Sequence, residues 1–303
     1  MWKCCLVVWC CWVSVCGGVV FTKGVVEVGR GGRLESIRYL GGGKKVVFLH
    51  GTFHDARAFD EYWLPELAKS GYEAMALSLR GTKGSSVVKK VKLGEHVEDV
   101  LDVLRRENKC FLVAHSFGGP VAMEIFRREP ELLWGMALVC SVPPSGNFAM
   151  TARTVRRSLS DAWLITRSFA LKTAAKSTDD ARRLFFTKSD ISETSLEKYV
   201  SWFAENSKAS LDLRDFQKNL PSRYCDSNGQ ATFITQQKPP TLVLGAANDL
   251  IVDATALKET AVFLGNDEKV VTIPNAPHDL MLDPATWRRG LDEITTWMDK
   301  VTV

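Results

Sequence analysis

Short apolar runs alternate with amphipathic segments along most of this 303-residue chain. Lys45–His50 (KVVFLH) and Thr241–Gly245 (TLVLG) are rich in β-branched residues, which is typical of strands that are covered on both faces. Segments such as Leu93–Asn108 instead carry apolar residues at helical spacing. Strands that alternate with helices predict an α/β fold with a mostly parallel sheet and helices on both of its faces.

The same pattern divides the chain into a core and an insertion. Residues 143–240 lie between two predicted strands and contain helical patterns, and a structureless loop of that length is unusual. We therefore predict a core made of 27–142 and 241–303, with a helical segment at 143–240 inserted before the last two strands. The predicted core strands are 34–40, 45–50, 72–79, 111–114, 133–142, 241–245 and 269–273, and the core helices are 60–70, 93–108, 121–128, 254–264 and 287–300. The predicted insertion helices are 147–176, 179–187, 192–207 and 210–220.

Residues 1–26 differ from the rest of the chain. One early charge, Lys3, precedes an apolar run from Cys4 to Phe21, and five of the eight cysteines lie in this segment. The pattern fits a cleaved signal peptide, and the run is near the lower length limit of a membrane anchor. Paired cysteines beside an apolar segment are also candidates for palmitoylation. The alternatives are a disordered extension outside the fold or an artefact of the gene model, so membrane contact through residues 1–21 is a hypothesis. The sequence therefore does not decide whether the protein is secreted, is attached to a membrane, or lies in the cytoplasm or a plastid.

Composition excludes some classes of function. The chain is 46% hydrophobic and 24% charged, and its net charge of +4 is too small to predict a nucleic-acid partner. Three cysteines follow the N-terminal run, and two of them lie in apolar strand-like segments, which predicts buried reduced thiols. The five histidines show no metal-ligand spacing. One of them, His96, lies on a predicted surface helix and is expected to be exposed. The oligomeric state cannot be predicted.

Cys110–Ala122 (CFLVAHSFGGPVA) carries the first candidate chemistry. A buried strand is predicted to turn sharply into a helix at Ser116, with the small residues Ala114 and Gly118 two positions on either side. This A-x-S-x-G pattern is typical of a nucleophile elbow, in which small neighbours let the strand and the helix approach closely. Glycine-rich turns around a serine also occur in nucleotide-binding folds, so the motif alone leaves both interpretations open.

Two loops near the C-terminus supply an acid and a histidine. Asp249 follows the strand TLVLG, and His278 follows the strand KVVTI. The chain order is therefore Ser, Asp, His, with all three expected at the carboxyl ends of strands, where sites form in parallel sheets. Asp253 is the nearest rival to Asp249, but it precedes a predicted helix and suits an N-cap.

Together these segments resemble the α/β-hydrolase superfamily. The matching pieces are HGTFH (50–54), RGTKGSS (80–86), AHSFGG (114–119), GAANDLIVD (245–253) and APHDLMLD (276–283). The resemblance implies that Ser116 is the nucleophile, that His278 is the general base and that Asp249 orients His278. It also implies an oxyanion hole made by the backbone N–H groups of Thr52 and Phe117. The serine at the nucleophile position argues against the dehalogenase and epoxide-hydrolase branches, whose chemistry needs a carboxylate there.

The function expected from this resemblance is hydrolysis of a carboxylic ester through an acyl-enzyme, without a cofactor or a metal. The expected partner is a small-molecule or lipid ester, and residues 143–240 would form a lid over the site. These residues hold 15 Lys and Arg against 10 Asp and Glu. That balance suits anionic headgroups or an anionic substrate, or is simply a solvated surface. Acyl transfer, C–C bond hydrolysis and ligand sensing on the same scaffold remain alternatives.

Overall fold

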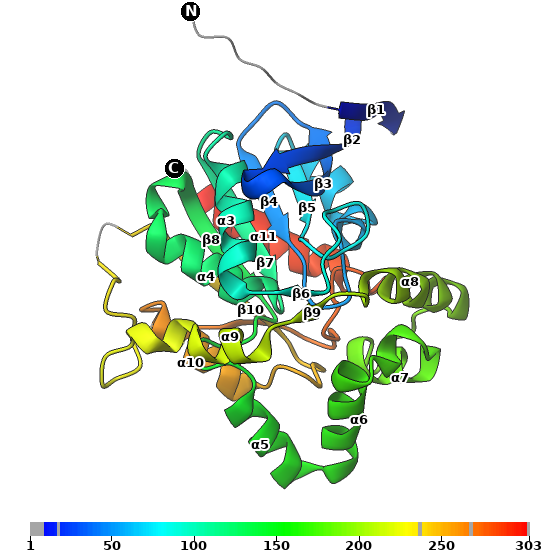
Figure 1. Cartoon of the computed structure of the whole chain (residues 1–303), viewed down its shortest axis with the longest axis vertical. Coiled ribbons are helices and arrows are strands. Elements are labelled where there is room, and N and C mark those ends of the chain that lie inside the picture. Colours follow the sequence, from blue (N-terminus) through cyan, green and yellow to red (C-terminus); the bar gives the residue numbers. More distant parts are fainter. Residues whose placement is uncertain (1–8, 17–18, 236–237, 267–268, 302–303) are drawn as a thin grey trace, which may run out of the picture.

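A computed structural model of the chain describes residues 9–16, 19–235, 238–266 and 269–301. Figure 1 shows a central sheet flanked by helices, with α5 to α8 gathered in a lobe of their own at one end. The predicted α/β class with a mostly parallel sheet is confirmed. Among the described helices, none has the length and apolar character needed to cross a bilayer.

The sheet has nine described strands in the order β1-β2-β3-β5-β4-β7-β8-β10-β11. The ladders from β5 through β4, β7, β8 and β10 to β11 are parallel. The ladders that join β1, β2, β3 and β5 are antiparallel. The strands are β1 (Trp9–Cys16), β2 (Val19–Val28), β3 (Gly32–Leu40), β4 (Lys45–Leu49), β5 (Glu73–Ser78), β7 (Cys110–His115), β8 (Leu133–Val139), β10 (Thr241–Ala246) and β11 (Val271–Ile273). A separate parallel pair joins β6 (Lys90–Val91) to β9 (Ser210–Leu211).

Core helices cover both faces of the sheet. In Figure 1, α3 and α4 lie in front of the strands and α11 lies behind them. Every residue of β7 is buried, as a strand between two helical layers must be. The core helices are α1 (Arg57–Asp60), α2 (Trp63–Lys69), α3 (Leu93–Leu104), α4 (Gly118–Arg128), α10 (Ala254–Phe263) and α11 (Trp287–Val301).

The N-terminal boundary differs from the prediction. A division at residue 26 falls inside β2, which pairs with β3 from Val20↔Leu40 to Val28↔Gly32. β2 is rich in valine, Phe21 stacks on Tyr39 with ring centroids 5.0 Å apart, and Lys23 forms an ion pair with Asp60 at 2.9 Å. The described parts of the apolar run, in β1 and the start of β2, therefore belong to the sheet, and the β-branched residues of β2 suit a strand. Residues 1–8 and 17–18 lie outside the described residues, and the signal or anchor hypothesis stays a prediction.

The segment between β8 and β10 is helical, but its first helix is shorter than expected. The predicted helix 147–176 is two helices, because Ser158 adopts an extended conformation and its hydroxyl accepts a hydrogen bond from the Asp161 N–H at 3.2 Å. A serine in this role starts a new helix. The helices of the insertion are α5 (Phe148–Arg157), α6 (Leu159–Ala170), α7 (Thr178–Phe185), α8 (Glu193–Asn206) and α9 (Leu213–Lys218).

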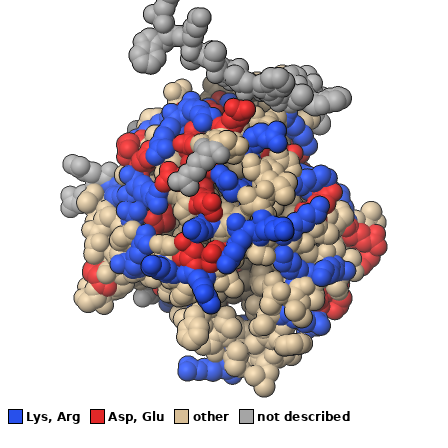
Figure 2. Space-filling view, in the orientation of Figure 1, with Lys and Arg blue, Asp and Glu red and all other residues tan. Residues whose placement is uncertain are grey.

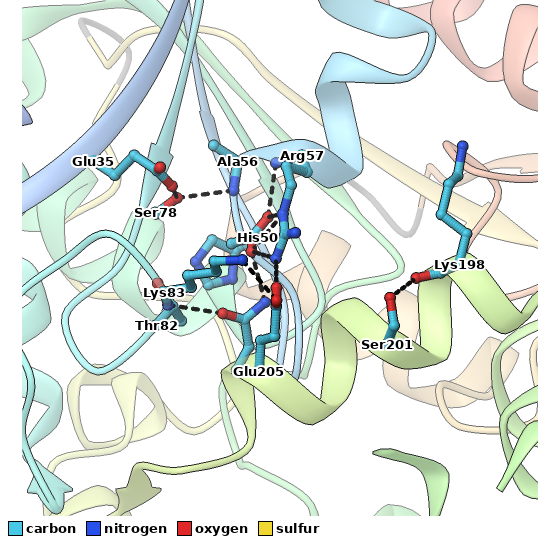
Figure 3. Close-up of polar contacts among 12 residues, drawn as sticks. Glu35, His50, Ala56, Arg57, Ser78, Thr82, Lys83, Lys198, Ser201 and Glu205 are labelled. Atoms are coloured by element: carbon cyan, nitrogen blue, oxygen red, sulfur yellow. Dashed lines mark hydrogen bonds and ion pairs between the residues drawn. The ribbon is translucent and has the colours of Figure 1, made fainter. Parts of the chain in front are cut away.

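A polar network that runs from the buried Asp55 to the exposed Lys83 ties α8 to the core (Figure 3). Arg57 contacts the Asp55 carboxylate at 2.6 Å and the Glu205 carboxylate at 2.7 Å. Lys83 pairs with the other oxygen of Glu205 at 2.6 Å, and the Asn206 amide donates to Asp55 at 2.7 Å. Burial alone would raise the pKa of Asp55, but the hydrogen bonds and charge of Arg57 outweigh it and hold that pKa below its usual value. The insertion is therefore fixed to the sheet by charged groups at the end of α8.

Candidate active site

The predicted strand–turn–helix around Ser116 is present. β7 ends at His115, Ser116 has a left-handed backbone with φ of +51°, and α4 begins at Gly118. A Cβ at Gly118 would lie 2.8 Å from the carbonyl oxygen of Leu49, so only glycine fits beside β4. The serine is thus held in a strained turn at the carboxyl edge of the sheet, supported by a hydrogen bond from its N–H to the Val139 carbonyl at 3.0 Å.

The fold brings Ser116, His278 and Asp249 together. His278 Nε2 lies 3.1 Å from the Ser116 Oγ, and His278 Nδ1 lies 2.7 Å from the Asp249 Oδ2. The other oxygen of Asp249 accepts from the N–H groups of Ile251 and Val252 at 2.7 and 2.9 Å. The side chains of His278 and Asp249 are each 1% exposed. A serine, a histidine and a carboxylate therefore form one buried hydrogen-bonded chain.

Two opposing effects set the protonation of His278. Burial disfavours the imidazolium, but the charge of Asp249 and its hydrogen bond outweigh burial and raise the pKa of His278 above the ordinary value. The Asp249 carboxylate also makes Nδ1 the protonated nitrogen of the neutral ring. The lone pair of Nε2 then points toward the serine hydroxyl, which is the arrangement a general base needs.

Asp253, the alternative to Asp249 as the acid of the site, makes a different set of contacts. Its carboxylate caps α10 by accepting the Ala256 N–H at 2.8 Å and pairs with Arg153 at 2.7 Å. The predicted N-cap role of Asp253 is confirmed.

A pocket of about 420 Å³ opens above Ser116 between the sheet edge and the insertion. Thr52 and Phe117, the predicted oxyanion-hole residues, line it together with Ser116. Among the described lining residues the single charged side chain is that of Lys172, whose ammonium group donates to the Ala209 carbonyl and the Ser210 hydroxyl, both at 3.3 Å, and to the Ser207 carbonyl. The remaining lining residues are mostly apolar: Phe53, Val142, Asn147, Met150, Thr151, Thr154, Ala162, Ile165, Thr166, Phe169, Ala170, Ala209, Ser210, Leu211, Leu213, Phe216 and Ile251.

Comparison with known families identifies the scaffold. The family model described as "Alpha/beta hydrolase family" matches residues 46–289, which include the strands from β4 to β11, the insertion and all three site residues. The chain belongs to the α/β hydrolase family.

Relatives of this α/β hydrolase have several activities. An esterase/lipase-type protein of Haemophilus influenzae is 32% identical over 107 residues, which is 32% of this chain and 34% of that protein. Epoxide hydrolase B of Mycobacterium tuberculosis is 35% identical over 115 residues, which is 34% of this chain and 30% of that protein. These two alignments thus span about a third of each relative. The sn-1-specific diacylglycerol lipase ABHD11 of Danio rerio is 22% identical over 90% of both chains.

Solved structures show the same fold at low identity. A thermophilic esterase from Thermogutta terrifontis superposes on this α/β hydrolase with a TM-score of 0.62 at 19% identity, covering 92% of this chain and 99% of that one. Because the identity is so low, the superposition supports the fold alone.

Histidines beside the α/β-hydrolase site form a buried cluster. His54 Nε2 lies 2.8 Å from the Asp279 carboxylate, and His115 Nε2 lies 3.1 Å from the carbonyl oxygen of His278. The other nitrogen of His115 has no partner among the described residues. His50 is also internal, since its Nε2 accepts the Leu79 N–H at 2.9 Å. His50 and His54 are therefore both packed inside the protein, and no sequence motif points to the His54–Asp279 pair.

The prediction that His96 is exposed is wrong. His96 is 6% exposed, and its ring packs edge-on against Phe117 with centroids 5.6 Å apart. The amphipathic pattern of α3 places it on the inner side, and burial lowers its pKa to about 3. A histidine within a surface helix was therefore assigned to the wrong face.

Cys140 is a contact that sequence reasoning missed. Cys110, Cys140 and Cys225 are free thiols, and the first two are buried as expected. Burial, followed by the nearby charge of Asp249 and a hydrogen bond to it, raises the pKa of Cys140 well above its usual value. The neutral thiol is therefore a second hydrogen-bonding partner of the Asp249 carboxylate, beside His278.

Two groups of side chains in the described residues have ligand atoms close enough for a metal, which the histidine spacing did not predict. They are His115, His278 and Asp279, and Cys140, Asp249 and His278. Both groups need His278, whose ring nitrogens already face Ser116 and Asp249. A metal would have to displace one of those hydrogen bonds, so the donor set fits the observed chain of residues better than it fits an ion.

The aromatic residues of the insertion have different surroundings. Phe169 contributes to the pocket wall, Phe186 is buried against Tyr199 of α8, and Phe185 and Phe203 are buried against His54 of the core. Trp202 lies under the Arg57 guanidinium at 4.9 Å, and Trp163 is exposed.

Proposed function

We propose that this α/β hydrolase cleaves carboxylic esters through a covalent acyl-enzyme on Ser116. The observation that carries the proposal is the hydrogen-bonded chain from Ser116 through His278 to Asp249, which opens into an apolar pocket. Its parts have the roles of a nucleophile, a base and an orienting acid. Family membership supports hydrolysis in general, and the chain of residues supports the ester chemistry.

In the proposed first step, Ser116 Oγ attacks the ester carbonyl carbon while His278 Nε2 takes the hydroxyl proton. Asp249 accepts the Nδ1–H of His278 and stabilises the imidazolium that forms. His278 then gives the proton to the departing alkoxide, which leaves as the alcohol. In the second half, water attacks the acyl-enzyme, His278 takes the water proton and returns it to Ser116, and the carboxylic acid is released.

The oxyanion would be held by the backbone N–H groups of Thr52 and Phe117. Both residues line the pocket beside Ser116, and Phe117 is the first residue after the nucleophile. Preorganised N–H donors at this point lower the barrier because negative charge develops there in the transition state.

The pocket favours a neutral, largely apolar substrate. Most of its lining is aliphatic or aromatic, and the ammonium group of Lys172 is occupied by oxygen atoms of the insertion. We therefore favour an uncharged acyl group over an anionic substrate. Helices α5 to α9 would act as the lid, since α5, α6 and α9 supply one wall of the pocket.

Epoxide hydrolysis is the activity of one relative, but the residues here favour ester hydrolysis. In the epoxide-hydrolase branch of the superfamily that the sequence resembles, the nucleophile is a carboxylate. This chain has a serine, Ser116, at that position. We expect no turnover of styrene oxide under conditions where p-nitrophenyl esters are cleaved.

Labelling with a fluorophosphonate probe tests the proposal. The wild-type chain should be labelled and Ser116→Ala should not. Ser168→Ala is a matched control, because Ser168 is also buried and its hydroxyl has no partner among the described residues. A series of p-nitrophenyl esters of increasing acyl length should show turnover that is lost in Ser116→Ala and kept in Ser168→Ala. A folded wild-type chain that neither labels nor turns over any ester would overturn the proposal.

A further inference from the structure

Helices α5 and α6 carry an unusual concentration of exposed apolar side chains. Of the ten large apolar residues that are exposed in the described part of the chain, five lie between Phe148 and Leu171. Phe148 is 80% exposed, Leu159 75% and Trp163 62%. Phe148 and Val155 are seven residues apart on α5, and Leu159 and Trp163 are four apart on α6, so each pair shares one side of its helix. These four residues, with Arg156 and Arg157 between them, are called the α5–α6 face below.

The two arginines of the face outnumber the nearby carboxylate, Asp161 of α6. Arg156 and Arg157 are both exposed, and within the described ranges no carboxylate lies at ion-pair distance from either, although the charge of Arg157 helps to lower the pKa of Asp253. The neighbouring Arg153 and Arg167 differ, because they pair with Asp253 and Asp180. Figure 2 shows the lobe that carries these helices as mostly tan, with blue at its lower end. Apolar side chains with exposed arginines among them are typical of helices that lie in a lipid–water interface.

The face adjoins the pocket. Met150 and Thr154 of α5 and Ile165 and Phe169 of α6 line the cavity above Ser116. The same two helices therefore present one side to the pocket and an adjacent side to solvent. A molecule that left an apolar phase at this face would have a short path to Ser116.

We infer that the α5–α6 face docks on an anionic lipid layer. Trp163 and Leu159 enter the headgroup region, Arg156 and Arg157 contact lipid phosphates, and the pocket opens toward the lipid. Docking itself does not need a reactive serine. The further idea that the lipid layer supplies ester substrates to Ser116 rests on the proposed function.

Sedimentation with vesicles tests the docking. The full chain carrying Ser116→Ala, which keeps the lipid intact, is mixed with limiting amounts of phosphatidylglycerol or phosphatidylcholine vesicles. We expect preferential binding to phosphatidylglycerol that weakens as salt is raised. Leu159→Ser/Trp163→Ser and Arg156→Glu/Arg157→Glu should each weaken it by about tenfold or more, since each basic residue near an anionic surface contributes measurably.

Matched controls separate the face from general effects. Arg183→Glu/Arg289→Glu makes the same change in net charge at two exposed positions elsewhere, and Val87→Ser removes an apolar side chain that is 93% exposed. Both controls should bind as the unchanged chain does. Equal binding by face variants and controls would overturn the inference.

A second measurement works even if the apolar N-terminal residues also bind lipid. Vesicles of brominated phosphatidylglycerol quench tryptophans that enter the bilayer, so the bound chain should lose more fluorescence than its Trp163→Phe variant. An unchanged quenched signal would show that position 163 stays in water and would overturn the inference. Concentration-dependent dimerisation that is lost in Leu159→Ser/Trp163→Ser, without any effect on lipid binding, would assign the face to a second copy of the chain instead. Esterase activity of the wild-type chain, measured separately, keeps failure of docking distinct from failure of the proposed chemistry.

Discussion

The carboxyl edge of the sheet and the helical insertion face each other across one pocket, but they are built differently. At the sheet edge, Ser116, Asp249 and His278 are buried and held by backbone N–H groups and by each other. In the insertion, α5 and α6 meet the pocket with apolar side chains and expose further apolar side chains to solvent. One side of the pocket presents hydrogen-bonding groups, and the other presents mainly apolar side chains.

This difference separates chemistry from selection of the substrate. Directional hydrogen bonds hold atoms to within tenths of an ångström, as proton transfer requires. An apolar wall holds a ligand without fixing its orientation, so its shape determines which acyl groups fit. Changes at the sheet edge should therefore alter rates and pH profiles, whereas changes in α5 and α6 should alter substrate preference.

The largest effect is expected at Asp249. Asp249→Asn removes the charge that raises the pKa of His278 and no longer favours the reactive tautomer, so kcat should fall by about 10⁴-fold. The residual activity should also persist to lower pH. In the wild-type chain activity is lost as pH falls through the raised pKa of His278, and in the variant burial is left to lower that pKa. Rate–pH profiles for a p-nitrophenyl ester measure both changes, and an acid limb that stays in place would contradict the assigned role.

The next largest effect concerns the attachment of the insertion. Asp55→Ala leaves the Arg57 guanidinium and the Asn206 amide without their buried partner and should destabilise the chain by about 3 kcal/mol. Arg153→Ala breaks the tie between α5 and Asp253, where both side chains are more exposed, and should cost less than about 1 kcal/mol. Urea unfolding of the two variants beside the wild-type chain measures the contrast. Equal losses would mean that α5 is held as firmly as α8.

The sheet side should also be the acid-sensitive side. Because the pKa of His96 is about 3 in the folded chain, the unfolded chain binds a proton below about pH 6.5 that the folded chain does not. Stability should therefore fall between pH 7 and pH 5, and His96→Leu should make that fall smaller by about 2 kcal/mol. Unfolding curves of both chains at the two pH values give the difference. Identical pH dependence would show that His96 is not the responsible group.

The smallest effect is expected in the apolar wall. Ile165→Trp places a larger side chain in the pocket wall and so reduces the space for the acyl group. It should lower kcat/KM for long acyl esters by about tenfold, with short esters nearly unaffected. Leu159→Trp adds a similar volume on the exposed side of the same helix and should leave the acyl-length profile unchanged. The p-nitrophenyl ester series on both variants makes the comparison, and a uniform loss across all lengths would argue against a pocket role for Ile165.

Sequence patterns predicted the sheet edge better than the insertion. Ser116 directly follows the buried strand β7, and Asp249 and His278 lie in the loops after β10 and β11, so the order of the strands was enough to bring them to one edge. α5 and α6 are separated by the cap at Ser158, which a continuous helical pattern conceals. The aromatic residues of the insertion could not be divided among pocket, interior and surface, because that division depends on how separate helices pack. His96 and the first strands of the sheet were misjudged for related reasons: the inner side of α3 and the partner of β2 are set by tertiary contacts.

The network at Glu205 and Asn206 has a consequence for how this enzyme can diversify. It anchors the end of α8 to the sheet, so the residues from Val142 to Ala204 form a closed excursion with both ends fixed. Loop-closure entropy rises slowly with length, by about 0.6 kcal/mol for each doubling. A change in the length of the excursion therefore costs little chain entropy, provided that the contacts of Phe185 and Phe203 with the core are kept. The segment from Val142 to Ala204 is thus suited to replacement by a segment from another protein in order to change the substrate preference. Such a graft should end before Glu205, so that the network is kept.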